Sequence, residues 1–187
     1  MKLAQLFYAS NQLTLLRMVF LPLIVLCLVA GEHRWALALF ILAGLSDFLD
    51  GLLARTLHQQ TMLGQYLDPV ADKLLLSTMF LVLAVLHEIP WKFTIVVFSR
   101  DISILGVSAV LYATTALRDF RPSIFGKANT TTQVAAIFFV LLRQVHDAEW
   151  VEYGRLVGLW GTFCFTILSG VHYVFLVGPR LRRAQGT

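Results

Sequence analysis

Long apolar stretches separated by short polar segments dominate the sequence. Each stretch comes close to the roughly 20 mostly apolar residues that a helix needs to cross a bilayer. We therefore expect six membrane-spanning helices, at residues 12–30, 35–56, 68–88, 91–114, 127–146 and 151–177. The pattern predicts an all-α polytopic membrane protein in which residues 1–187 form a single domain, a bundle of six transmembrane helices.

The polar segments between these stretches fall into two sets, one for each membrane face. One set is 31–34, 87–92 and 143–150; the other is the amino terminus, 56–65, 117–127 and 179–187. The second set is the more basic, with Lys2, Arg55, Arg118, Arg121, Lys127, Arg180, Arg182 and Arg183. Because basic loops stay on the cytoplasmic side, both termini are expected there. Residues 1–10 are too short to cross and are expected to form a small interfacial helix.

Composition supports a location in the lipid bilayer. Hydrophobic residues make up 58% of the chain and charged residues 14%, and the mean hydropathy is +0.74. Soluble domains average roughly 45–50% apolar and about 25% charged residues. The net charge of +4 does not indicate a nucleic-acid partner, because the basic residues lie at the ends of apolar segments. There they set membrane topology and contact anionic headgroups.

Four of the eleven acidic residues lie close together, at Asp47, Asp50, Asp68 and Asp72. They fall at the expected cytoplasmic ends of the second and third spans, where ionised side chains are costly and repel one another unless cations neutralise them. Spacings of three and four residues put each pair on one helix face. Two such pairs on adjacent antiparallel helices converge, and carboxylate oxygens suit Mg²⁺, Mn²⁺ or Ca²⁺. The cluster predicts a site for two divalent ions.

Two other interpretations of the aspartates and glycines in this region stay open. Asp47 and Asp72 could be carboxylates at helix ends, and Gly51 and Gly64 could serve helix packing. Intramembrane carboxylates can also mark the ion path of a cation transporter. A transporter would not explain Arg55, whose forked guanidinium suits a phosphate or a nucleobase, or the small residues that let a ligand approach the backbone.

The motif itself is specific. The chain reads D-F-L-D-G-L-L-A-R from Asp47, then eight residues, then G-Q-Y-L-D-P-V-A-D ending at Asp72. This resembles the signature of the CDP-alcohol phosphatidyltransferase family, D-x-x-D-G-x-x-A-R-x8-G-x-x-x-D-x-x-x-D, with every fixed position present. The family has six transmembrane helices with this motif across the second and third. Its members often form homodimers.

The resemblance implies a reaction and a set of roles. A phosphatidyl group passes from CDP-diacylglycerol to an acceptor hydroxyl with release of CMP, at a site near the cytoplasmic face of a bacterial-type or organelle inner membrane. The four aspartates would hold two Mg²⁺ or Mn²⁺ ions, and Asp72 would also be the general base. The cytidine-diphosphate pocket would comprise Gly51, Ala54, Arg55 and Gly64. Asn11 and Thr14, in a segment resembling N-x-x-T-x-x-R, would lie near the nucleotide, although Asn11 could instead cap the first helix.

The acceptor depends on other residues. Lys127 opens a segment that resembles elements of both phosphatidylglycerophosphate synthases and cardiolipin synthases of this fold. With Arg118 and Arg121 it would present cations to a phosphate, although Arg118 could simply serve membrane topology.

Arg100 lies inside the fourth expected span and needs a partner there. Asp101 is expected to point elsewhere on the helix, which favours a bound phosphate as the partner of Arg100. Phosphatidylglycerophosphate synthases typically carry a second arginine where this chain has Ser108. Losing a guanidinium weakens capture of doubly charged glycerol 3-phosphate. The sequence therefore favours a cardiolipin synthase that uses phosphatidylglycerol, with a phosphatidylglycerophosphate synthase as the alternative.

Overall fold

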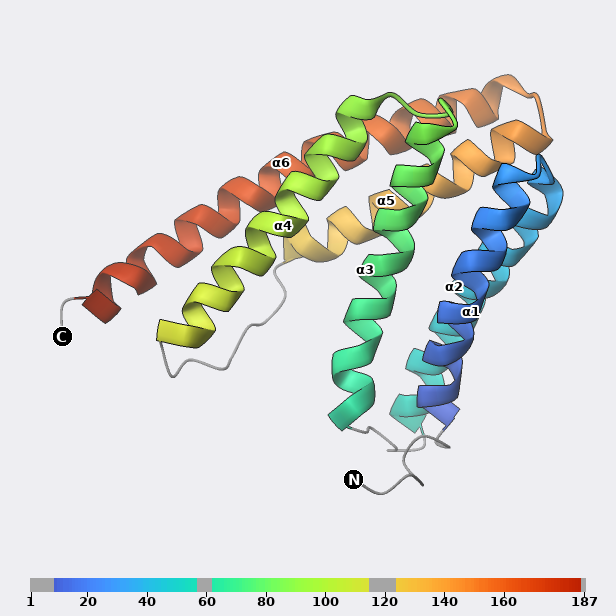
Figure 1. The fold of residues 1–187 in the computed structure, drawn as a ribbon. Coiled ribbons are helices and arrows are strands. Elements are labelled where there is room, and N and C mark those ends of the chain that lie inside the picture. The colour runs from blue at the N-terminus through green and yellow to red at the C-terminus, as the bar shows by residue number, and fades with distance from the viewer. Residues whose placement is uncertain (1–8, 57–61, 115–123, 186–187) are drawn as a thin grey trace.

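A computed structural model describes the backbone of residues 9–56, 62–114 and 124–185, and the side chains of residues 16–46, 49, 71–103, 106 and 126–171. The described chain is all-helical, and it contains six helices (Figure 1). They are α1 Ala9–Val29, α2 His33–Thr56, α3 Met62–Val85, α4 Trp91–Thr114, α5 Ile124–Val145 and α6 Glu149–Gln185. The expected all-α class and the number and order of the helices are thus confirmed. The expected interfacial helix at 1–10 lies almost entirely outside the described residues.

Two helix boundaries differ from the expected spans by more than one helical turn. α3 begins at Met62 rather than at residue 68, and α6 continues to Gln185 rather than ending at residue 177. α6 therefore includes most of the polar segment 179–187 that follows the last expected span. Hydropathy marks where a helix becomes polar, whereas backbone hydrogen bonding continues through polar residues that favour helix, such as those near the end of α6.

The helices alternate in direction along the chain. Figure 1 places the α1–α2, α3–α4 and α5–α6 turns together at its upper end, and the start of α1 and the α2–α3 connection at its lower end. We call these the turn end and the motif end. α1 packs against α2 and α3, while α6 packs against α5 and α4. α5 also contacts α2 and α3, and so joins the two groups.

One described segment is long and apolar enough by itself to cross a membrane, Glu149–Val171 of α6. Shorter apolar stretches occupy Leu16–Val29 of α1 and His33–Ser46 of α2. The described helices therefore establish a helical architecture with one candidate span.

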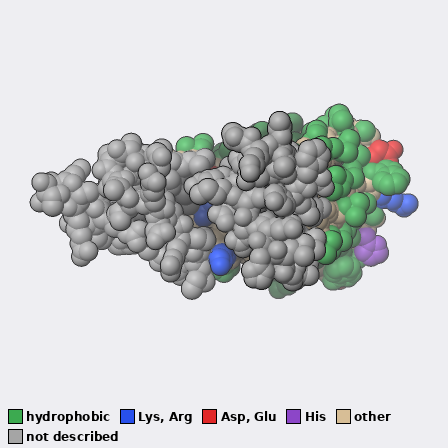
Figure 2. Space-filling view, turned by 90° about the horizontal axis from the view of Figure 1, so that it is seen from below, with side chains coloured by type: hydrophobic (Ala, Val, Ile, Leu, Met, Phe, Trp, Pro, Cys, Tyr) green, Lys and Arg blue, Asp and Glu red, His purple; other side chains and the backbone are tan. Residues whose placement is uncertain are grey.

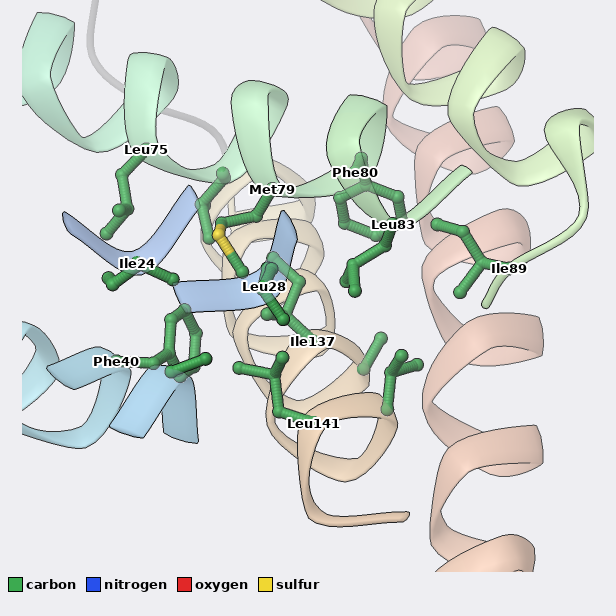
Figure 3. Close-up of a cluster of buried hydrophobic side chains, with 14 of the residues drawn as sticks. Ile24, Leu28, Phe40, Leu75, Met79, Phe80, Leu83, Ile89, Ile137 and Leu141 are labelled. Carbon is green, nitrogen blue, oxygen red and sulfur yellow. The ribbon is translucent and has the colours of Figure 1, made fainter. Parts of the chain in front are cut away.

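A buried apolar cluster holds α1, α2, α3 and α5 together. Figure 3 shows side chains from these four helices meeting one another, among them Ile24, Phe40, Met79, Phe80 and Ile137. Tight packing of this kind supplies the attraction between helices where lipid, rather than water, surrounds them. The cluster fixes the spacing of α1 and α3. These two helices also carry Arg17 and Asp72, which lie nearer the motif end than the cluster does.

The α5–α6 contact is close because α6 carries glycines where it meets α5. A Cβ added at Gly158 would lie 2.9 Å from the Cα of Ala136, and one added at Gly154 would lie 2.5 Å from the ring of Phe139. Neither substitution fits without a shift of the neighbouring helix or ring. Glycines spaced four apart thus allow the two backbones to approach.

Two of the turns share one geometry. The N–H of Glu32 donates to the Cys27 carbonyl at 2.8 Å, and the N–H of Glu88 donates to the Leu83 carbonyl at 2.9 Å. The residues before them, Gly31 and His87, have φ of 76° and 61°. This is the Schellman arrangement, which ends a helix on a left-handed residue. Glycine adopts that conformation freely, whereas a histidine does so under strain.

Candidate active site

The four aspartates lie on two consecutive helices, in the halves of α2 and α3 that are nearer the motif end. Asp47 and Asp50 are on α2, and Asp68 and Asp72 are on α3, so the helical register expected for each pair is confirmed. The two helices run in opposite directions and are joined by residues 57–61, a connection short enough to keep their ends close (Figure 1). The side chains of Asp47, Asp50 and Asp68 lie outside the described residues. Convergence of the four carboxylates therefore stays a prediction.

The other motif residues are placed by their backbones alone. Gly51, Ala54 and Arg55 continue α2 beyond Asp50, and Gly64 lies in the first turn of α3. Asn11 and Thr14 lie in the first two turns of α1, which also begins at the motif end. Arg118 and Arg121 fall outside the described residues.

Asp72, whose side chain is described, forms an ion pair with Arg17 of α1. The Arg17 side chain is only 2% exposed, while that of Asp72 is 37% exposed. The contact joins residues 55 positions apart and brings the N-x-x-T-x-x-R segment to the aspartate motif. A buried cation next to this carboxylate restrains its position.

Sequence reasoning quoted Arg17 without giving it a partner. The signal was nevertheless present, because Arg17 is a charge within the apolar part of an expected span and such a charge requires a partner. The same argument was applied to Arg100 alone.

A second charged group joins α3, α4 and α6. The Asp101 Oδ1 accepts from the Arg100 Nη1 at 2.7 Å and from the Lys73 Nζ at 3.1 Å. The Arg100 Nη2 in turn donates to the Ser169 Oγ at 3.0 Å. The side chains of Arg100 and Asp101 are 13% and 14% exposed, and that of Lys73 is 39% exposed. We call Lys73, Arg100 and Asp101 the α3–α4 charge cluster.

The expectation that Asp101 points away from Arg100 is wrong. Consecutive helix positions differ by about 100° around the axis, but the long arginine side chain spans that angle. Burial of the Asp101 carboxylate also makes pairing with both cations favourable. Lys73 was missed by sequence reasoning, although it directly follows Asp72.

A buried polar row lies between α5 and α6. The Thr166 Oγ1 donates to the Asn129 Oδ1 at 2.7 Å. Gln133, one turn after Asn129 on α5, and Thr162, one turn before Thr166 on α6, are also buried. Within the described part of the chain, the Asn129 Nδ2 and the Gln133 Nε2 have no hydrogen-bond partner. Lys127, two residues before Asn129 on α5, is exposed. The row ties α5 to α6 by hydrogen bonds across the helix interface.

The donor set suits a divalent cation. Oxygen ligands from four carboxylates are the kind that Mg²⁺ and Mn²⁺ take, and the helical register places each pair on one face. Among the described side chains alone, no group of three or more His, Cys, Asp or Glu residues is close enough to hold a metal ion. The fit therefore depends on the register of α2 and α3.

Comparison with known proteins gives one consistent result. The family model described as CDP-alcohol phosphatidyltransferase matches residues 7–168. The CDP-diacylglycerol–glycerol-3-phosphate 3-phosphatidyltransferase of Bacillus subtilis is 31% identical over 183 residues, which cover 89% of this chain and 93% of that protein. A probable phosphatidylglycerophosphate synthase of Mycobacterium tuberculosis is 32% identical over 171 residues, covering 88% of this chain and 79% of the relative. The human cardiolipin synthase (CMP-forming) is 30% identical over 175 residues, covering 85% of this chain and 56% of the relative.

Proposed function

We propose, from the premise that this chain belongs to the CDP-alcohol phosphatidyltransferase family, that it moves the phosphatidyl group of CDP-diacylglycerol onto a glycerol-type hydroxyl and releases CMP. The chain is an enzyme of the phosphatidyltransferase class, which acts in phospholipid biosynthesis. The observation that carries the proposal is the family match over residues 7–168, which includes the whole aspartate motif on α2 and α3.

We place all six helices across the membrane, with the motif end in the cytoplasm. Three tryptophans support this orientation, because Trp35, Trp91 and Trp150 each lie within the first turns of a helix at the turn end and are exposed. Exposed tryptophans gather where a membrane meets water. The turn end would then lie at the opposite interface, and the basic segments near the motif end would face the cytoplasm.

The four aspartates would hold two divalent cations, Mg²⁺ or Mn²⁺. When bound, these cations would neutralise the charge of the pyrophosphate and stabilise CMP as the leaving group. Gly51, Ala54, Arg55 and Gly64, with Asn11 and Thr14, would bind the cytidine diphosphate. Asp72 would accept the proton of the acceptor hydroxyl as that oxygen bonds to phosphorus. Arg17 would hold the Asp72 carboxylate in the position where it meets this hydroxyl.

For the acceptor we favour phosphatidylglycerol, with Arg100, Lys127, Arg118 and Arg121 as the cations nearest its phosphate. Ser108 replaces the second arginine typical of phosphatidylglycerophosphate synthases, and a lipid acceptor is also anchored by its acyl chains. Glycerol 3-phosphate is the second candidate, because relatives named for both activities have similar identity to this chain. We expect a homodimer in either case.

One assay tests the reaction and the acceptor together. The purified protein in lipid nanodiscs receives CDP-diacylglycerol and Mg²⁺ or Mn²⁺, with phosphatidylglycerol or glycerol 3-phosphate supplied separately. We expect CMP and cardiolipin with phosphatidylglycerol. Product with glycerol 3-phosphate alone would assign the second candidate, and no CMP with either acceptor would overturn the proposed reaction.

A matched pair of variants controls this assay. Asp68→Asn removes a proposed metal ligand, whereas Asp147→Asn removes a carboxylate that is 86% exposed and lies at the turn end. Loss of CMP release in the first variant alone would assign the chemistry to the motif end.

A further inference from the structure

The α3–α4 charge cluster contains two cations and one anion. Both cations contact the same Asp101 oxygen, the Arg100 guanidinium at 2.7 Å and the Lys73 ammonium at 3.1 Å. Ser169, the other described partner of Arg100, is a neutral hydroxyl. A single carboxylate neutralises one cation, so the described cluster carries one positive charge in excess.

This excess charge lies beside the proposed active site. Lys73 directly follows Asp72 on α3, and α3 packs against α4, which carries Arg100 and Asp101. Seen from the motif end, Lys or Arg side chains are visible near the middle of the molecule (Figure 2). An anion held by the cluster would therefore sit close to the carboxylate proposed as the base.

The cluster also has unused hydrogen-bonding capacity. The Nε of Arg100 is buried and has no hydrogen-bond partner among the described residues. The Lys73 ammonium makes one described contact, although it can donate three hydrogen bonds. Buried cations in a membrane protein that exceed their anions favour binding of a further anion.

We propose that the α3–α4 charge cluster binds the phosphate of the acceptor and that Asp101 sets its charge to match a phosphodiester. A phosphodiester carries one negative charge, which equals the excess of the cluster. A phosphomonoester carries nearly two, and one of them is left without a counter-charge. This inference rests on the proposed function, and it assigns acceptor-binding and specificity roles to Lys73 and Asp101.

Two variants change the charge of the cluster in opposite directions, and a third leaves it unchanged. Asp101→Asn raises the excess from one to two, Lys73→Gln lowers it to zero, and Asp101→Glu leaves it unchanged. For each, kcat/KM is measured with phosphatidylglycerol and with glycerol 3-phosphate. Binding of glycerol 3-phosphate to the protein without CDP-diacylglycerol is measured separately by calorimetry.

We expect Asp101→Asn to raise the preference for glycerol 3-phosphate over phosphatidylglycerol by about tenfold and to tighten glycerol 3-phosphate binding by a similar factor. Lys73→Gln should shift the preference the other way and weaken that binding. Asp101→Glu should keep the preference of the unmodified protein. If Asp101→Asn does not fold, Lys73→Gln decides alone, because that side chain is partly exposed and tolerates replacement.

Equal loss with both acceptors in both charge-changing variants would show a purely structural role and overturn the inference. An unchanged acceptor preference in active variants would overturn the inference and leave the proposed function intact. No CMP from the unmodified protein with either acceptor would overturn both.

Discussion

The ion pairs at the turn end of the bundle differ from those nearer the motif end. At the turn end, Arg143 pairs with Asp147 at 2.6 Å and with Glu152 at 3.2 Å, and Glu152 also pairs with Arg155 at 2.5 Å. These partners lie within the α5–α6 hairpin and are close in sequence. Nearer the motif end, Arg17 reaches from α1 to α3, and near the middle of the bundle Lys73 reaches from α3 to α4.

This difference separates an end with a structural role from the end where we propose the active site. Pairs within a hairpin stabilise its turn, and they place few demands on the remaining helices. Pairs between helices place charged groups in fixed positions at a shared surface, at the cost of burying them. These buried pairs lie near the place where the four aspartates are predicted to converge, as expected where charge serves binding and catalysis.

The largest expected effect is on catalytic activity, and it distinguishes a variant in the aspartate motif from one at the turn end. Asp72→Asn should keep nucleotide binding and lower turnover by about 10²–10⁴-fold, because the amide cannot accept the proton of the acceptor hydroxyl. CMP release and nucleotide binding are measured on the same preparation, with Asp147→Asn as the matched control at the turn end. Full turnover in Asp72→Asn would disprove the assignment of Asp72 as the base.

The next effect is on the free energy of unfolding, for one variant near the aspartate motif and one at the turn end. Arg17→Met removes the buried partner of Asp72 and should lower the free energy of unfolding by about 3 kcal/mol. Arg143→Met breaks pairs that are partly exposed and should cost about 1 kcal/mol or less. Denaturant unfolding in detergent measures both. Equal losses would mean that the two ends do not differ in this way.

A third test concerns the close helix contact near the turn end. Gly158→Ala should destabilise the protein by about 1–3 kcal/mol, because its Cβ would meet the Ala136 backbone and push α5 from α6. Gly44→Ala, where nothing lies within 4 Å of the added Cβ, is the control and should be neutral or slightly stabilising. Thermal unfolding of the two variants checks the prediction, and a neutral Gly158→Ala would contradict it.

The smallest expected effect lies in the turns. His87→Gly should raise stability by up to about 1 kcal/mol, since His87 has a positive φ that glycine adopts without strain. Gly31→Ala, at the equivalent position of the α1–α2 turn, should lower stability by a similar amount. Melting temperatures of the two variants should move in opposite directions; a shift of the same sign would refute the strain argument. Neither variant should alter CMP release.

The helices were predictable because apolar stretches of spanning length leave few other structures. The ends of the helices were less predictable, because α3 begins at Met62 and α6 continues to Gln185. Backbone hydrogen bonding extends there into polar sequence that hydropathy does not assign to a span. The aspartates stood out because ionised residues are rare in such stretches.

Contacts between helices were not predictable in the same way. The pairing of Arg17 with Asp72 depends on how α1 packs against α3, and a single sequence does not contain that packing directly. The pairing of Arg100 with Asp101 was predicted wrongly, because helical geometry describes where a side chain begins and not where its flexible end lies. The polar row of Asn129 and Thr166 could have been found, since buried polar residues recur at intervals of about one turn on both helices.

The most direct test of the account measures both products of the reaction at once. The purified protein is incubated with CDP-diacylglycerol, phosphatidylglycerol and Mg²⁺, and the CMP and cardiolipin formed are quantified beside the Asp72→Asn variant. The account predicts equal amounts of CMP and cardiolipin from the unmodified protein and almost none from the variant. CMP released without a phosphatidyl product, or equal turnover by the two proteins, would contradict it.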